Sequence, residues 1–194
     1  MDLDFTKDIQ LENERVLLRP FMESDWVNLL EVATEDESLV QFSPYLIHTE
    51  EYIKEFINTA IKNRANKTHY SFIIFDKKTQ TYAGSTSFWN LSNKDKRLEI
   101  GATWIGKEFQ KTGLNRQCKF LLMSYAFDIL EFERVELKTD ERNTQSRNAI
   151  QKIGGQFEGI MRSHTLMNDG FRRSTVIYSI LKNEWQALKL NFPK

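Results

Sequence analysis

RLEIGATWIGKEFQKTGLNRQCKF, residues 97–120, reads as a strand, a short polar loop and the beginning of a helix. Within 97–105 alternate side chains are apolar, which predicts one strand face with Leu98, Ile100, Ala102 and Trp104 and an opposite face with Glu99, Gly101 and Thr103. Residues 114–130 carry apolar side chains at helical spacing, on more than one side of the predicted helix. With a further strand predicted at 134–140, this segment forms a strand–helix–strand crossover.

The rest of the chain supplies further strands and helices on both sides of this crossover. Upstream, the patterns predict a strand at 15–21, helices at 23–33 and 49–64, and strands at 69–76 and 81–91. Downstream, they predict a helix at 141–155 that ends in glycine, a hairpin of 156–166 and 171–181, and a polar helix at 181–189. We therefore predict one α/β domain over residues 1–194, with a mostly antiparallel mixed sheet of about six to seven strands flanked by helices.

Composition limits the partners and the compartment. The 194 residues include 27 basic and 27 acidic side chains, so no net field attracts nucleic acid or an acidic membrane. The single cysteine, Cys118, excludes an internal disulfide framework and fits a reducing compartment. The chain has no run of about 20 apolar residues, and its first ten residues lack the apolar core of a signal peptide. We expect a cytoplasmic protein that binds neither nucleic acid nor membrane.

The loop at 110–115 can bind phosphate or can be an ordinary turn. Gly113 lies directly before the predicted helix, whose unpaired amide groups and positive dipole end attract phosphates. Lys107, Lys111 and Arg116 add positive charge around it. The alternative is that Gly113 only relaxes the loop and that the charges are solvated. Residues 101–107 also match the opening of a P-loop, but Glu108 stands where a hydroxyl would bind magnesium, so we reject that interpretation.

Three segments together resemble the GNAT superfamily of acyl-CoA-dependent N-acyltransferases. Gln110-x-x-Gly113-x-Asn115 is similar to its pyrophosphate loop, Gln/Arg-x-x-Gly-x-Gly/Ala, and residues 97–106 resemble its fourth strand. Asn143-x-x-Ser146 with the following Ile150 and 152–154 resembles the fourth helix of the branch that acetylates ribosomal-protein N-termini (the RimJ/RimL-like branch). The resemblance extends from about residue 14 to residue 181.

Two positions depart from the family pattern. Asn115 replaces a small residue, and its side chain could cap the helix and leave the amide cradle intact. Ile150 replaces a tyrosine that protonates the departing thiolate in many of these enzymes, although the ribosomal branch commonly lacks it.

The resemblance implies an N-acetyltransferase that carries acetyl from acetyl-CoA to a primary amine by direct attack in a ternary complex. It implies that acetyl-CoA is bound by a set of backbone and side-chain groups: Gln110, Lys111, Thr112, Gly113, Leu114, Asn115, the amide of Trp104 or Ile105, Asn143 and Ser146. Ser146 is also a candidate donor to the sulfur. The alternative for Asn143 is a purely structural helix cap.

Glu99 is the candidate base that takes the proton of the amine, directly or through a water. A carboxylate that is partly shielded from water accepts a proton more readily near neutral pH. The equally weighted alternative is an exposed strand residue or an ion-pair partner. Trp89, at the end of the strand 81–91, either lines the amine pocket or packs in the core.

Other polar residues give no separate site. His48, His69 and His164 lack metal-ligand spacing, so we predict no metal. Arg172 and Arg173 are interpreted as a solvated edge, with recognition of an acidic substrate as the alternative. The sequence leaves open the acceptor, which is a protein or peptide N-terminus or a small amine, and it leaves open a homodimer. The rival hypothesis is a catalytically silent acyl-CoA-binding or scaffold protein of the same fold.

Overall fold

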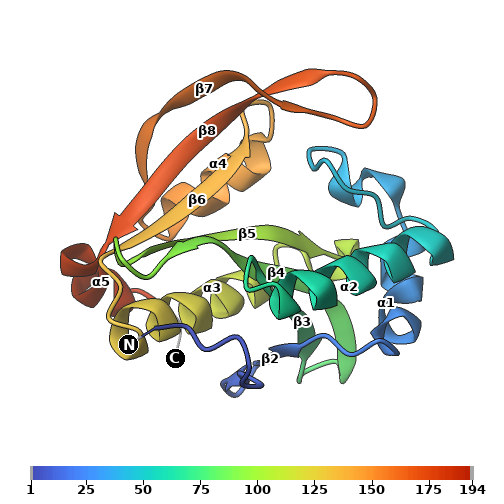
Figure 1. Cartoon of the computed structure of the whole chain (residues 1–194), viewed down its shortest axis with the longest axis horizontal. Coiled ribbons are helices and arrows are strands. Elements are labelled where there is room, and N and C mark those ends of the chain that lie inside the picture. Colours follow the sequence, from blue (N-terminus) through green and yellow to red (C-terminus); the bar gives the residue numbers. More distant parts are fainter. Residues whose placement is uncertain (1, 193–194) are drawn as a thin grey trace.

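The computed structural model describes residues 2–192, which form one continuous sheet with helices packed against it (Figure 1). The elements are β1 (Leu11–Glu12), β2 (Val16–Pro20), α1 (Asp25–Thr34), α2 (Glu50–Ala65), β3 (Tyr70–Asp76), β4 (Thr81–Ser92), β5 (Arg97–Ile105), α3 (Leu114–Ser124), β6 (Arg134–Asp140), α4 (Thr144–Lys152), β7 (Gln156–Leu166), β8 (Arg172–Leu181) and α5 (Lys182–Lys189). Single 3-10 turns occupy Glu37–Val40 and Lys107–Phe109, and a π-helical turn, Tyr125–Ile129, extends α3.

The sheet has eight strands in the order β1-β2-β3-β4-β5-β6-β8-β7. Only β5 and β6 run parallel, and all other neighbours are antiparallel. The predicted α/β class and mostly antiparallel mixed sheet are confirmed, with the two-residue β1 as the strand that the sequence pattern missed. The predicted helix at 141–155 is shorter, because its first turn begins only after Asn143.

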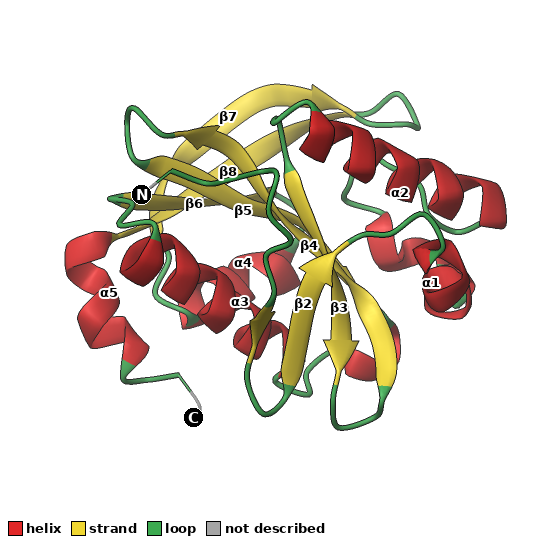
Figure 2. Cartoon of the chain, turned by 60° about the horizontal axis from the view of Figure 1, so that its bottom comes forward, coloured by secondary structure: helices red, strands yellow, loops and turns green. Residues whose placement is uncertain are grey.

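Helices cover both faces of the sheet. Figure 2 shows α1 and α2 on one side of the twisted strands and α3 on the other. On the α2 side Trp104 of β5 packs edge-on against Phe56, with ring centroids 6.4 Å apart. On the α3 side Lys119 donates a hydrogen bond of 2.7 Å to the hydroxyl of Thr103. Successive residues of β5 therefore contact helices on opposite faces.

A bulge in β5 corrects the predicted face assignment of that strand. Ile100 pairs with Phe88, which stacks on Tyr125 beyond α3, so Ile100 points to the α3 face. Trp104 points to the α2 face instead of sharing the face of Ile100. The register against β4 shifts between Ser85 and Ser87, and Ala102 has a φ of 47°. One extra residue in a strand reverses the alternation beyond it, and the sequence pattern carries no sign of that insertion.

Candidate active site

Strands β5 and β6 diverge to form a V-shaped opening in the middle of the sheet. They pair only at three positions, where residues 97, 98 and 99 lie opposite residues 134, 135 and 136. Figure 1 shows the two strands leaving a common start and separating toward their carboxyl ends. The edge of β5 beyond Glu99 is therefore not paired with β6, and its backbone groups can bind another extended chain.

The orientation of the backbone distinguishes the two amides considered for the thioester carbonyl. The carbonyl oxygen of Trp104 faces β4. It lies so close to Gly84 of β4 that a Cβ atom added to that glycine would be 2.1 Å from the oxygen. The amide of Gly106 also faces β4 and donates to Ala83 at 2.9 Å. Alternation along the strand then turns the amide of Ile105, between them, toward β6 and the opening.

The loop before α3 has the geometry of an anion-binding helix start. Gly113 has a φ of 90°, a left-handed conformation that glycine adopts without strain, and a Cβ built on it would meet nothing within 4 Å. The N-cap of α3 is Gly113, which has no side chain, and within residues 2–192 the one side-chain contact to the first amides is a long one of 3.4 Å from the amide of Leu114 to the hydroxyl of Thr112. The suggestion that Asn115 caps the helix is wrong, because its side-chain oxygen is buried without a hydrogen-bond partner. The open amides and the lack of a Cβ fit a pyrophosphate at this turn.

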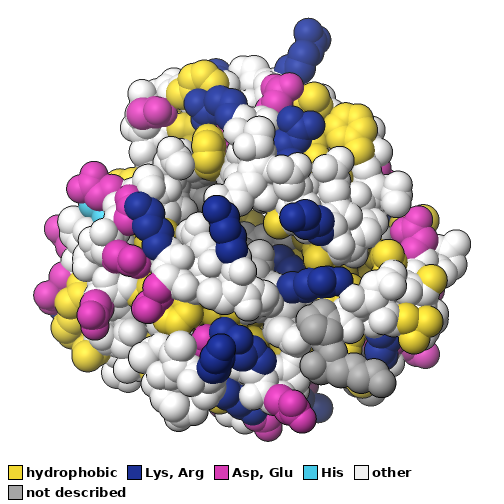
Figure 3. All heavy atoms as spheres, turned by 180° about the vertical axis from the view of Figure 1, so that it is seen from behind, with side chains coloured by type: hydrophobic (Ala, Val, Ile, Leu, Met, Phe, Trp, Pro, Cys, Tyr) yellow, Lys and Arg dark blue, Asp and Glu magenta, His cyan; other side chains and the backbone are white. Residues whose placement is uncertain are grey.

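The cations around this loop differ in how freely they can meet a ligand. Lys107 is paired with Asp36, and Arg116 donates to the carbonyl of Asn191 at 2.6 Å. Lys111 is exposed and forms no ion pair within residues 2–192. Seen from behind, the molecule carries several Lys and Arg side chains around a hollow (Figure 3). Of the three predicted cations, Lys111 is the one left for a phosphate.

Gln110 links the two sides of the V. The side-chain NH₂ group of Gln110 donates to the backbone carbonyl of Ile105 at 3.1 Å. The side-chain oxygen of Gln110 accepts from the side-chain NH₂ group of Gln145 in α4 at 3.1 Å. Thr112 donates to the carbonyl of Phe109 at 2.7 Å and so tightens the turn before Gly113. These contacts hold the loop against the end of β5.

The beginning of α4 faces the V from the other side. Asn143 is the N-cap of this helix, and its side-chain oxygen accepts the amide of Ser146 at 2.9 Å. The capping alternative for Asn143 is thus realised, and its side-chain NH₂ group retains its donors. Ser146 is half-buried one turn into the helix, whereas Ile150 is buried against Gly155.

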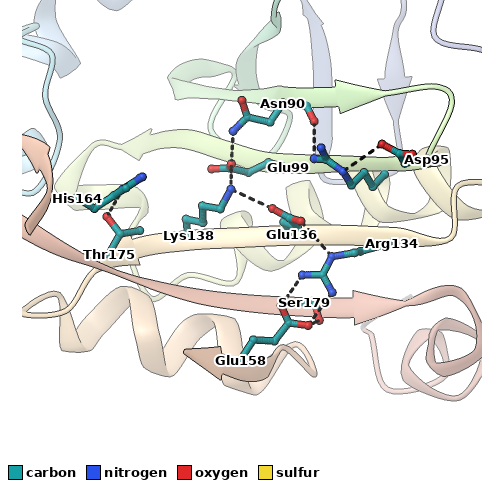
Figure 4. A network of polar contacts seen from close by, with 11 residues as sticks. Asn90, Asp95, Glu99, Arg134, Glu136, Lys138, Glu158, His164, Thr175 and Ser179 are labelled. Carbon is teal, nitrogen blue, oxygen red and sulfur yellow. Dashed lines mark hydrogen bonds and ion pairs between the residues drawn. The ribbon is translucent and has the colours of Figure 1, made fainter. Parts of the chain in front are cut away.

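Glu99 lies at the point where β5 and β6 separate, with 8% of its surface exposed. One oxygen, Oε2, accepts from Asn90 at 2.7 Å and from the ammonium of Lys138 at 2.8 Å (Figure 4). The other oxygen, Oε1, faces Gly101, where a Cβ would approach it to 3.2 Å. The carboxylate of Glu99 is therefore shielded from water, as predicted, and it also forms the ion pair that was the alternative.

A chain of alternating charges continues from Glu99 across the sheet. Lys138 also contacts Glu136 at 2.9 Å, and Arg134 connects Glu136 to Glu158 of β7 (Figure 4). Burial disfavours the charge on Lys138, but its hydrogen bonds and ion pairs with Glu99 and then Glu136 outweigh burial and raise its pKa. Lys138 is therefore firmly protonated inside the V.

A cavity of about 350 Å³ lies beside Glu99 on the α2 face of the sheet. It is lined by Pro44, Tyr45, Leu46, Tyr52, Glu55, Phe56, Thr59, Ala60, Asn63, His69, Ser71, Ser87, Trp89, Ala102 and Asn168. Trp89 pairs with Glu99 across β4 and β5, and its ring lies 4.1 Å from that of His69. Trp89 is half-buried and lines this cavity.

Two residues of this region were not singled out as candidates from the sequence. His69 was considered only as a metal ligand, but it lies beside Trp89, and burial lowers its pKa so that the ring is neutral at pH 7. Lys138 is one of 27 basic residues, and nothing in its local pattern distinguishes it. Both positions follow from the pairing of strands, which spacing along the chain does not specify.

The remaining sequence candidates can be placed directly. Cys118 is fully buried, and burial raises the pKa of its thiol to about 12. The interpretation of Arg173 as a solvated edge is wrong, because it is half-buried and donates to the carbonyl of Phe42. No cluster of three metal-ligating side chains occurs among residues 2–192. Nor does any helix in that range have the length and hydrophobicity needed to span a bilayer.

Comparison with known proteins identifies the family. The family model described as "Acetyltransferase (GNAT) domain" matches residues 15–156. The chain belongs to the GNAT acetyltransferases. The predicted family and the prediction of an acetyltransferase enzyme are thereby confirmed.

Individual relatives agree with this family. "Putative ribosomal N-acetyltransferase YdaF" of Bacillus subtilis is 37% identical over 106 residues, which are 55% of this chain and 57% of that protein. The matched part thus spans little more than half the length of that relative. "Uncharacterized N-acetyltransferase YoaA" of the same organism is 26% identical and covers 89% of this chain and 96% of its own. A GCN5-related N-acetyltransferase from Brucella melitensis has a TM-score of 0.88 at 26% identity, over 95% of this chain and 83% of that chain.

Proposed function

We propose that this GNAT acetyltransferase transfers acetyl from acetyl-CoA to a primary amine by direct attack in a ternary complex. The observation that carries the proposal is the position of Glu99. The carboxylate lies where β5 and β6 separate, between the V that would hold the thioester and the cavity beside Trp89. Acetyl-CoA supplies an activated acetyl thioester, and the other requirements fall to the chain's own residues.

The residues that would hold acetyl-CoA follow the edge of the V. The turn at Gly113 and the open amides of α3 suit the pyrophosphate, with Lys111 as the nearby free cation. The unpaired edge of β5 suits the extended pantetheine arm, and the alternation of the strand favours Ile105 over Trp104 as the amide donor. The side-chain NH₂ group of Asn143 is a further donor at the opposite wall.

Glu99 can accept the proton of the amine through Oε1. Asn90 and Lys138 occupy Oε2 and fix the orientation of the carboxylate. Gly101 leaves the approach to Oε1 open. A base held in one orientation within hydrogen-bond reach of the nucleophile contributes roughly 10²–10⁴-fold to such a reaction.

Two groups can stabilise the departing thiolate in place of the absent tyrosine. The hydroxyl of Ser146 lies on the α4 wall, and the ammonium of Lys138 lies inside the V. Two donors of Lys138 are used by Glu99 and Glu136, and the third has no partner in the described part of the chain. A hydrogen bond from an ammonium favours the thiolate over the thioester.

Direct attack is supported by the state of the only cysteine. Cys118 is in the core with its thiol pKa raised to about 12, so it is a poor nucleophile for an acetyl-enzyme intermediate. Initial-velocity lines should therefore intersect when both substrates are varied. Parallel lines, together with acetyl label retained on the protein, would contradict direct attack.

The decisive test is Glu99→Gln, measured as thiol release from acetyl-CoA with a panel of amines. We expect kcat/KM at pH 7 to fall by about 10²-fold and the loss to shrink at high pH, where free amine is abundant. Acetyl-CoA affinity measured by calorimetry should be unchanged, which separates catalysis from binding. Tight binding of acetyl-CoA with no thiol release from any amine, by the unaltered protein, would instead support the silent acyl-CoA-binding alternative.

A further inference from the structure

The cavity beside Glu99 is lined mainly by aromatic, aliphatic and uncharged polar residues. Four of its lining residues, Tyr45, Tyr52, Phe56 and Trp89, carry aromatic rings. The polar lining residues Thr59, Asn63, Ser71, Ser87 and Asn168 carry no charge, and Ser71 and Ser87 are hydrogen-bonded to each other at 2.9 Å. Three further lining residues, Tyr45, His69 and Trp89, each have a buried polar atom without a hydrogen-bond partner among residues 2–192. The cavity thus offers dispersion and ring contacts together with a few uncharged hydrogen-bonding groups.

Charged side chains are nearly absent from this lining. Glu55 is its only carboxylate, it is exposed on α2, and no lysine or arginine is among the lining residues. His69 adds no charge near neutral pH, because burial lowers its pKa. Glu99 beside the cavity is already paired with Lys138. A second ammonium on a bound amine would lose its hydration, and the only carboxylate in the lining to meet it is that of Glu55, which is exposed and therefore a weak partner.

Two loops close the cavity on the side away from the sheet. Asn168, in the turn between β7 and β8, reaches the segment around Tyr45, and Figure 1 shows this hairpin tip beside the loop that precedes α2. The guanidinium of Arg142 lies 3.9 Å from the ring centre of Phe171 and 5.7 Å from that of Phe42, which joins the two loops. The volume of about 350 Å³ is near the lower end of ligand pockets and suits a body of one ring or one short apolar chain.

We propose that the acceptor is a primary amine attached to a compact, uncharged, apolar body, with an aromatic ring preferred, and that polyamines and aminoglycosides are poor substrates. This inference rests on the proposed acetyl transfer and names the substrate class of that site. The apolar body occupies the cavity between Phe56 and Trp89, and the amine points toward Oε1 of Glu99. A small arylalkylamine has such an amine on an apolar body, and so does a peptide whose first residue is apolar.

The first experiment compares amines with the unaltered protein. We expect kcat/KM for 2-phenylethylamine to exceed that for 1,5-diaminopentane and for kanamycin by about tenfold or more, because the polycations bury unpaired charge. Two pentapeptides that differ only in an N-terminal Phe or Lys form a second arm. Preference for the Phe peptide over all three of these amines would identify a peptide as the source. Preference for the diamine, kanamycin or the Lys peptide overturns the inference.

The second experiment places a charge in the cavity. Asn63→Asp adds a carboxylate to the lining with almost no change of shape, and Asn58→Asp makes the same change on the same helix at an exposed position outside the cavity. We expect the preference for 1,5-diaminopentane relative to 2-phenylethylamine to rise about fivefold in Asn63→Asp and to stay unchanged in Asn58→Asp. Equal ratios in the two variants would show that the cavity does not hold the acceptor.

The failure of the substrate class and the failure of the reaction are distinguishable. Turnover that favours polycations overturns the inference and leaves acetyl transfer standing. No thiol release with any amine, in a protein that binds acetyl-CoA, overturns the proposed function and the inference together.

Discussion

At the scale of single residues, Glu99 shows how a site depends on partners that are remote in sequence. Its carboxylate is held by Asn90 from β4 and by Lys138 from β6, 39 positions further along the chain. The sequence pattern predicted Glu99 as a strand residue with a free side next to Gly101, and both features are present. Lys138 could not be predicted, because only the parallel pairing of β5 with β6 brings it to Glu99.

Lys138→Met should change the pH dependence of the reaction. Without the ammonium, Glu99 and Glu136 lose the cation that they share, and two neighbouring carboxylates without a cation between them repel each other. We expect the acid limb of the kcat/KM profile to move to higher pH and kcat/KM at pH 7 to fall about tenfold. Lys182→Met, which removes a lysine paired at the surface with Glu133, is the matched control. An acid limb that stays in place would rule out this role of Lys138.

Gly113→Glu should abolish acetyl-CoA binding. The added carboxylate would meet the pyrophosphate at the start of α3, and we expect the Kd to rise by about 10²-fold or more. Gly113→Ala is the control, because it imposes the same left-handed backbone strain, about 1–2 kcal/mol, without the charge, and a Cβ has open space there. If both variants bind acetyl-CoA equally well in a calorimetric titration, the loop does not hold the pyrophosphate.

At the scale of elements, the sequence predicted the order of strands and helices well and the local irregularities poorly. Apolar periodicity predicted α2, α3 and the strands β2 to β8, since these elements bury a regular stripe or face. The bulge at Ala102 has no such signal, because its backbone conformation depends on pairing with β4. The aromatic cavity could not be predicted either, apart from Trp89, because its lining residues come from six separate segments of the chain.

The packing of α3 on β5 predicts an unusual stability effect of Lys119. This lysine is 7% exposed, its ammonium contacts only the Thr103 hydroxyl among the bonds described for residues 2–192, and burial lowers its pKa to about 8. The ordinary pKa of a lysine is 10.5, so at pH 7 Lys119 is protonated in both the folded and the unfolded chain. The free energy of unfolding at pH 7 is therefore lowered by the full cost of burying this charge.

Lys119→Met should therefore stabilise the protein at pH 7 by about 1–3 kcal/mol in urea unfolding, since Thr103 and Thr86 can still bond to each other at 2.8 Å. The gain should shrink between pH 8 and 10.5, as the folded and then the unfolded lysine lose their protons. Lys152→Met, at an exposed position, should show neither effect. Destabilisation at every pH would mean that the ammonium is a net stabilising contact.

At the scale of the whole molecule, buried carboxylates paired with arginines connect the strands to the helices and loops. Arg15 pairs with Asp76, and Arg142 pairs with Asp140. In the same way, Arg19 of β2 pairs with Asp25, the first residue of α1. The side chain of Asp25 is fully buried and also accepts from the amide of Met22 at 2.8 Å. Burial alone would raise the pKa of Asp25, but the hydrogen bonds from Arg19 and then Met22 outweigh it and lower the pKa below 3.8.

Asp25→Asn should reveal this contribution through its pH dependence. A carboxyl whose pKa is lower in the folded chain stabilises the fold above its unfolded value of 3.8 and loses that contribution as pH falls through the lower folded value. We expect Asp25→Asn to lower the free energy of unfolding at pH 7 by about 3 kcal/mol, because Arg19 is left with an uncompensated charge. Below pH 3.8 the difference from the unaltered protein should shrink, since Asp25 then becomes protonated as well. Asp95→Asn, at a pair with a separation of 3.9 Å and a half-exposed carboxylate, is the matched control. A constant difference between pH 7 and pH 3 would mean that Asp25 contributes through shape and hydrogen bonding, and that its charge is not what joins α1 to the sheet.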